Sequence, residues 1–196
     1  MELEQAARES GLVRPEHLQA LLRSLTNRTF GWLVCDPSRR DERLQGDLVS
    51  GLPVAIVAPD GTPRCKPFTT MVINNVCDLQ PGRSECVTVA PVQEFDRFAE
   101  GVAANDDPGR TKNFLDDVRR NQVDGLFYIP HCPQLPKGGV VRFDRLASMS
   151  ANIYEQSLAD GRRLASLTQS GFYFLLMKLT RFLVRPESPD VARENP

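Results

Sequence analysis

A short polar cluster after an apolar run is the group of side chains in this sequence whose types and spacing are best suited to chemistry. Asn75-Val76-Cys77-Asp78 follows the apolar run at 68–73. Asp78 could act as a general base, and Cys77 could act as a nucleophile if a base lay beside its thiol. Aspartate after a strand more commonly forms a turn by bonding to nearby backbone. We therefore favour the turn and keep Asp78 as a candidate acid or base.

A second group lies in a proline-rich corner, where His131 precedes Cys132. Imidazole titrates near neutral pH, so His131 could supply a proton to a leaving group, or serve Cys77 in a cysteine hydrolase. A metal site with Cys77 or Cys86 would require adjacent residues to share one tetrahedral ion, and no C-x-x-C pair supports it. P-loop, G-x-S-x-G, dinucleotide-binding and H-E-x-x-H motifs are absent from the sequence, so we expect no metal and no cofactor.

Basic residues could bind a polyanion at two places in the sequence. Arg39, Arg40 and Arg43 share one polar segment, Arg119-Arg120 lie in another, and both have acidic neighbours. A solvated surface of mixed charge is the default for such patterns. Lys66, at the start of an apolar run, has the same two interpretations, a phosphate contact or a solvated lysine.

The composition limits the class of protein. The 196 residues carry a net charge of −1, with 41% hydrophobic and 25% charged residues, which suits one domain with extensions and gives no global basic field for nucleic acid. Five widely spaced cysteines favour reduced thiols over a disulfide framework. The N-terminal segment does not resemble a secretory signal, and the longest apolar run, at 172–177, is too short to cross a bilayer. We expect a cytoplasmic protein with no membrane segment.

Apolar periodicity predicts the elements that position these side chains. Leucines at three- and four-residue spacing predict an amphipathic helix at 14–27, and 168–184 carries a wide apolar face after a threonine suited to capping. Short apolar runs between proline and glycine turns predict strands at 30–35, 52–58, 68–73, 86–90, 125–129 and 140–143. Two short helices interrupt the strands within 93–123, and the arginine-rich segment 36–45 is predicted to be an exposed loop.

Five short motifs occur in order along these strands. They are Gly46-Asp47-Leu48-Val49, Lys66-Pro67, Val72-Ile73-Asn74-Asn75, Val87-Thr88-Val89-Ala90-Pro91-Val92 and Gly139-Val140-Val141-Arg142-Phe143-Asp144-Arg145-Leu146. In this order they resemble the MazF/PemK-like toxin family, whose closing segment is similar to 164–183. The resemblance implies a fold that is mainly β with peripheral helices: a small, strongly bent SH3-like barrel with an N-terminal helix, a helical insertion and a C-terminal helix.

The resemblance also implies a function, a growth-inhibiting toxin that cuts single-stranded RNA without a metal. It implies a homodimer in the cytoplasm and an antitoxin or other protein partner. Lys66 stands where the family has an arginine expected to stabilise charge on the transferred phosphate, and lysine keeps the charge but lacks the bidentate fork. Gln93 stands where the family has a threonine, so a hydroxyl is lost.

We therefore take Lys66 as the candidate catalytic cation, with Asp78 and His131 as the acid–base pair. The candidate RNA contacts are Arg39, Arg40, Arg64 and Gln93. The departures at Lys66 and Gln93 support an alternative, a catalytically inactive barrel that binds a protein or nucleic acid.

The predicted domain organisation follows the same resemblance. A helical extension occupies 1–28, the barrel with its helical insertion at 93–123 occupies 29–185, and a disordered tail occupies 186–196. The extension and the insertion would be the docking surfaces of an inactive barrel.

Overall fold

The structure, a computed structural model, describes residues 8, 11, 13–27, 34–35, 42–58, 60–104 and 107–184. The helices in these ranges are α2 (Pro15–Asn27), α3 (Phe95–Ala103), α4 (Pro108–Arg119), α5 (Ala151–Ala159) and α6 (Gln169–Leu183). The strands are β1 (Val34–Cys35), β2 (Leu48–Val57), β3 (Pro63–Val72), β4 (Cys86–Glu94), β5 (Leu126–Ile129), β6 (Gly139–Arg142), β7 (Ala147–Ser150) and β8 (Arg163–Leu167). None of the described helices combines the length and apolar character needed to cross a bilayer.

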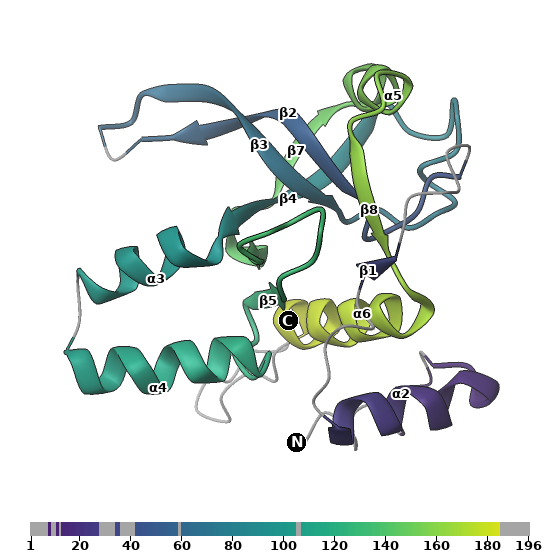
Figure 1. The fold of residues 1–196 in the computed structure, drawn as a ribbon. Helices are drawn as coiled ribbons and strands as arrows, with labels where there is room; N and C mark the ends of the chain where they lie inside the picture. Colours follow the sequence, from purple (N-terminus) through teal and green to yellow (C-terminus); the bar gives the residue numbers. More distant parts are fainter. Residues whose placement is uncertain are drawn as a thin grey trace, which may run out of the picture.

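One curled antiparallel sheet, with the strand order β1-β8-β2-β3-β4-β6-β5, forms the centre of the molecule (Figure 1). β4 takes two partners on its outer edge, since residues 92–94 pair with β6 and residues 86–89 pair with β7. A 3₁₀ turn, Phe143–Arg145, joins these two partners. β7 thereby comes beside β2 without pairing to it, and the sheet curls into a half-barrel. The predicted architecture, mainly β with a small, strongly bent barrel and peripheral helices, is confirmed.

The strongly patterned segments fold as predicted. The predicted helices at 14–27, 93–123 and 168–184 correspond to α2, to the α3–α4 pair and to α6. Thr168 caps α6, because its hydroxyl accepts a hydrogen bond from the Gly171 N–H at 3.2 Å. Of the predicted strand at 30–35, only β1 lies within the described residues. Most of the predicted exposed loop at 36–45 lies outside them, and at its described end Gln45 is buried, because its amide donates to the Ile73 carbonyl oxygen at 2.7 Å.

Three elements between the fifth motif and α6 have no counterpart in the sequence analysis: β7, α5 and β8. β7 has four residues and β8 has five, and both depend on pairing with distant strands for their hydrogen bonds. Phe143, predicted to end a strand, instead begins the 3₁₀ turn, where its ring is fully buried.

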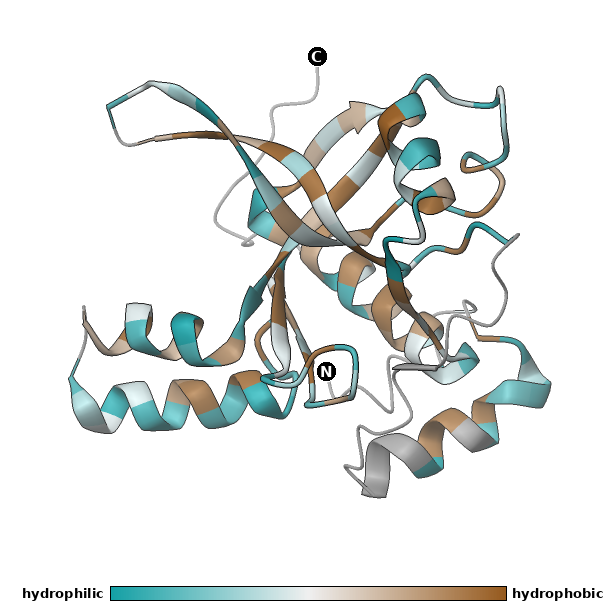
Figure 2. Ribbon diagram, turned by 45° about the horizontal axis from the view of Figure 1, so that its top comes forward, coloured by the Kyte–Doolittle hydropathy of each residue, from teal (hydrophilic) through white to brown (hydrophobic). Residues whose placement is uncertain are grey.

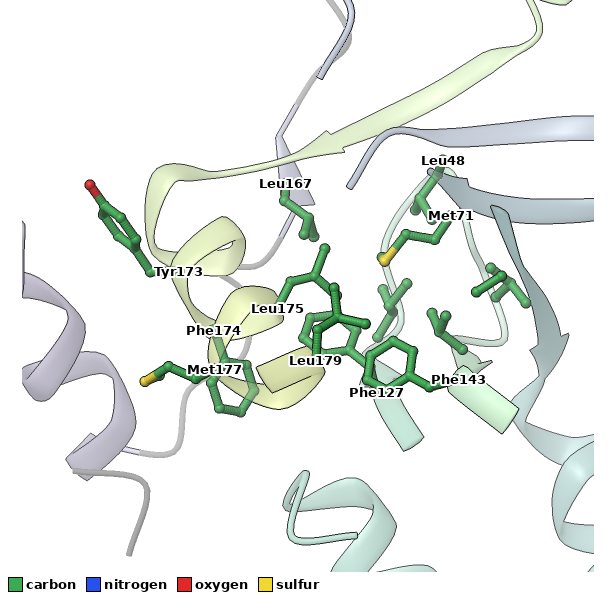
Figure 3. Packing of buried hydrophobic residues seen from close by; sticks show 14 of the residues in the cluster. Leu48, Met71, Phe127, Phe143, Leu167, Tyr173, Phe174, Leu175, Met177 and Leu179 are labelled. Atoms are coloured by element: carbon green, nitrogen blue, oxygen red, sulfur yellow. The ribbon is translucent and has the colours of Figure 1, made fainter. Parts of the chain in front are cut away.

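Three hydrophobic clusters attach the helices to the sheet, and Figure 2 shows the apolar residues following the inner strands and α6. The largest cluster joins α6 and α2 to one face of the sheet, with Phe174, Leu175 and Phe127 fully buried (Figure 3). The second fills the inside of the curl and includes Tyr154 of α5. The third packs the α3–α4 hairpin on β5 and β6 through Phe95, Phe98, Val118, Leu126 and Val140.

The Gly46-Asp47 motif has a structural role in this frame. The Asp47 carboxylate is fully buried, lies 3.1 Å from the Arg163 guanidinium and also accepts from Ser166 Oγ and the Leu44 N–H. Burial raises the pKa of Asp47, although these hydrogen bonds and the cation oppose the shift. Gly46 has a φ of +90°, and a Cβ there would lie 2.5 Å from Leu167 Cδ1. The motif therefore joins the start of β2 to β8.

Candidate nucleic-acid-binding groove

A groove of about 550 Å³ opens on the surface where β3, β4 and the start of α3 meet. The paired part of β3 and β4 contributes Thr69, Pro91 and Val92 to its lining. A volume of this size is typical of a site for a small ligand or for part of a larger one.

Two positions that the family resemblance singled out lie in this groove. Lys66, from β3, and Gln93, from β4, both line it. The reason is the register of the sheet: Thr69 pairs with Val92, so the antiparallel ladder carries the residues before Thr69 alongside those after Val92. Lys66 is exposed and Gln93 is half-buried. Residues 27 positions apart in the chain (66 and 93) are therefore brought into one site.

The groove is basic although the whole chain is slightly acidic. Besides Lys66, the cations lining it are Arg97 of α3, Arg142 at the end of β6 and Arg145 of the 3₁₀ turn. Glu94 is the one carboxylate among the described residues that line it. A concentration of one sign of charge in a concave site attracts an oppositely charged ligand regardless of the net charge of the protein.

The ion pairs around the groove are exposed and weak. The Glu94 carboxylate lies 3.4 Å from Lys137 Nζ and 3.9 Å from the Arg97 guanidinium, and all three side chains are about half exposed or more. The Arg142 guanidinium binds both oxygens of Asp144, at 3.0 and 2.5 Å, and these hydrogen bonds hold the pKa of Asp144 below its ordinary value. The exposed pairs of Glu94 contribute about 0–1 kcal/mol each, so an anionic ligand could replace them at small cost, whereas the bidentate pair of Arg142 is better formed.

Asp78 lies beyond the C-terminal end of β3, away from Lys66. The strand runs six residues from 66 to 72 before the loop that holds Asp78, a span of about 20 Å. Asp78 is exposed, and its N–H donates to the Asn75 side chain at 3.0 Å. The polar cluster therefore forms a turn, but Asn75 is the residue whose side chain makes it.

The remaining predicted site residues fall in three places. His131 is exposed in the connection between β5 and β6 and is not among the residues that line the groove. Arg64 is exposed on β3, two residues before Lys66. Arg39 and Arg40 lie outside the described residues. The structure thus brings Lys66 and Gln93 together and does not bring Asp78 or His131 into the groove with them.

The described cysteines and acidic residues form no metal centre. In the parts of the chain that the structure covers, no group of three or more histidine, cysteine, aspartate or glutamate side chains could hold an ion. Cys65, Cys77 and Cys86 are exposed thiols, and Cys132 is half-buried.

Four charged residues of the groove were not among the predicted site residues: Glu94, Arg97, Arg142 and Arg145. Arg142 and Arg145 lie in the fifth motif, which was noted only for its place in the order of motifs, and Glu94 and Arg97 lie within five residues after the fourth. The available signal was therefore a set of charged residues within the fifth motif and shortly after the fourth. Their convergence depends on the pairing of β4 with β6.

Comparisons with models of known protein families, with curated proteins and with solved structures find no match. The likeness to the MazF/PemK-like family therefore rests on the order of the sequence motifs.

Proposed function

We propose that this chain is a MazF/PemK-like toxin that binds and cuts single-stranded RNA in the basic groove, and that it acts on RNA in the cytoplasm. One observation carries the proposal: Lys66 and Gln93, the positions that correspond to the family's site, line one groove with three arginines. The arginines supply the phosphate contacts that the chain's net charge does not predict.

The shape of the groove favours a single strand. Residues of the paired strands β3 and β4 line it, its volume is about 550 Å³, and Phe68 lines it together with Lys66. Sequence-tolerant binding of single strands combines a basic groove with aromatic side chains on which bases stack. Phe68 is half-buried and could stack one unpaired base.

Cleavage needs a proton acceptor near the phosphate, and Glu94 is the candidate in the groove. The lining cations cannot accept a proton, and the Thr69 hydroxyl and the Gln93 amide are not basic. In the proposed reaction Glu94 takes the 2′-hydroxyl proton, the 2′ oxygen attacks phosphorus, and the bond from phosphorus to the 5′ oxygen breaks. Lys66 stabilises the charge on the phosphate, and the leaving 5′ oxygen takes a proton from water, which leaves a cyclic 2′,3′-phosphate.

The test is incubation of the purified protein with mixed single-stranded RNA in the presence of a chelator. We expect cleavage that is insensitive to chelation, falls roughly 100-fold in Lys66→Ala, and falls by a similar factor in Glu94→Gln, which keeps RNA binding. The matched control is Lys112→Ala, an exposed lysine on α4 away from the groove. Expression of the wild type, but not of Glu94→Gln, should arrest growth. If the wild type left the RNA intact and did not slow growth, the proposed nuclease activity would be rejected.

A second function, an RNA-binding barrel without cleavage, is favoured by the surroundings of Glu94. Its carboxylate faces Lys137 and Arg97, and neither predicted acid–base residue, Asp78 or His131, lines the groove. RNA binding that depends on Lys66, with no product and no effect on growth, would select this function. The homodimer and an antitoxin stay predictions, to be checked by light scattering and by co-purification with the products of neighbouring genes.

A further inference from the structure

The outer parts of β2 and β3 form a two-stranded ribbon that projects from the sheet (Figure 1). β3 pairs with β4 only at residues 69–72, and β2 pairs with β8 only at Leu48 and Val49. Beyond these positions, residues 52–57 and 63–68 pair with each other and with no other described strand. The base of this ribbon is one wall of the groove, which Ile56, Lys66 and Phe68 line.

One face of the ribbon continues the basic wall toward its tip. Directly opposed residues in an antiparallel pair point to the same face, and side chains alternate along each strand. Ile56 lines the groove and pairs with Arg64. Arg64 therefore shares a face with Ile56, Lys66 and Phe68, three residues that line the groove, while Pro67 and Thr69, which alternate with them, line it as well. The opposite face carries Cys65, which pairs with Ala55.

The spacing along this face matches a single nucleic-acid strand. Residues two apart in a strand are separated by about 6.6 Å, which is comparable with the distance between successive phosphates in an extended strand. Phe68, Lys66 and Arg64 follow one another at this interval and form a linear site of one aromatic ring and two cations. Duplex RNA would not follow it, because its bases are paired and its backbone is coiled.

We propose that the binding site extends from the groove along this face of the ribbon, with Lys66 and Arg64 binding successive phosphates of an extended RNA strand. The inference rests on the proposed RNA binding and adds that the substrate is longer than the groove and has a defined path out of it.

The surroundings of Arg64 allow this role. Its guanidinium lies 3.6 Å from Asp60, and both side chains are more than half exposed. Asp60 has its own partner in the turn, since one carboxylate oxygen accepts from the Thr62 N–H at 2.9 Å, and this bond lowers the pKa of Asp60. A phosphate could therefore take the guanidinium without leaving Asp60 uncompensated.

The experiment compares binding of a trimer and a decamer of 2′-O-methyl oligouridylate, which cannot undergo 2′-hydroxyl attack, by fluorescence anisotropy. The wild type should bind the decamer more tightly than the trimer. The difference should exceed the factor expected merely because a decamer offers several overlapping binding positions. Arg64→Ser should weaken decamer binding by about fivefold and reduce its salt slope by about 0.7, as expected for loss of one phosphate contact on a single strand. Trimer binding should not change.

The matched control moves the charge by one residue. The double variant Arg64→Ser, Cys65→Arg keeps the net charge and places the cation on the opposite face of the ribbon. We expect it to bind the decamer as weakly as Arg64→Ser. Decamer binding equal to the wild type in either variant would overturn the path along the ribbon while leaving the groove intact. If the wild type bound neither the trimer nor the decamer, the proposed RNA binding itself would be rejected.

Discussion

Charged residues occupy two contrasting environments in this molecule. At the junction of β2 and β8, the Asp47 carboxylate is 0% exposed and the Arg163 side chain 6%. In the groove, the Arg97 side chain is 77% exposed and that of its partner Glu94 is 48% exposed. The same kinds of ion pair thus serve different purposes: the buried pair has no access to a ligand and joins two strands, whereas the exposed pairs are weak enough for a ligand to replace.

The two lysines Lys178 and Lys66 differ in the same way. Lys178 on α6 is fully buried, and its amine donates to the backbone carbonyl oxygens of Asn121, at 2.9 Å, and Val123, at 2.5 Å. Burial lowers the pKa of Lys178 to about 7, with Asp124 opposing the shift. Lys66 is exposed beside the groove. Lys178 therefore anchors the loop before β5 to helix α6. Of these two lysines, only Lys66 is accessible to a ligand.

The largest effect should come from breaking the buried pair. Arg163→Leu leaves the Asp47 carboxylate buried without its cation, and we expect the free energy of unfolding to fall by about 3–5 kcal/mol. Urea unfolding measures this change. The matched variant is Arg97→Leu, which breaks the exposed pair with Glu94 and should cost no more than about 1 kcal/mol. Equal losses in the two variants would show that the buried and the exposed pair contribute alike to stability.

The second effect is a pH dependence that Lys178 imposes on stability. The pKa is about 7 in the folded protein and has its ordinary value near 10.5 in the unfolded chain, so between these values the unfolded chain binds more protons. Stability should therefore rise with pH over this window, by roughly 1 kcal/mol per unit between pH 8 and pH 10. Lys178→Met should lack this rise. The measurement is the free energy of unfolding in urea at pH 7, 8, 9 and 10 for the wild type and the variant. If the two proteins show the same dependence of this free energy on pH, the amine of Lys178 is not desolvated.

A smaller effect is expected from removing the cap of α6. Thr168→Ala leaves the Gly171 N–H without its side-chain acceptor, and we expect a loss of about 1 kcal/mol in the free energy of unfolding. Thr168→Ser keeps the hydroxyl and should restore most of the stability. An unchanged midpoint in Thr168→Ala would mean that packing in the large cluster alone determines where α6 begins.

The smallest effect on stability should occur in the groove, where the effect on binding is largest. Lys66→Ala should change the free energy of unfolding by less than about 0.5 kcal/mol, because surface substitutions away from the core rarely do more. The same variant should weaken RNA binding and reduce the salt slope by about 0.7. A marked loss of stability would place Lys66 with the structural charges instead.

Local pattern was sufficient for the elements with strong signals. The leucine spacing of α2, the apolar face and capping threonine of α6, and Pro108 at the start of α4 each depend on neighbours within a few residues. β7, α5 and β8 could not be found in this way, because their strands are short and their stability comes from β4, β2 and the inside of the curl. The burial of Asp47 was hidden for the same reason, since Arg163 lies 116 residues away.

The amino-acid sequence by itself determined the order of the strand motifs, the helices α2, α3, α4 and α6, and the two positions, Lys66 and Gln93, that line the groove. Only the tertiary structure decided which other side chains join them, because the pairing of β4 with β3 and β6 brings Arg97, Arg142 and Arg145 to one site. It also decided which charges are buried. Solvent exposure, the property that separates a structural ion pair from one that a ligand can replace, results from packing between segments far apart in the chain.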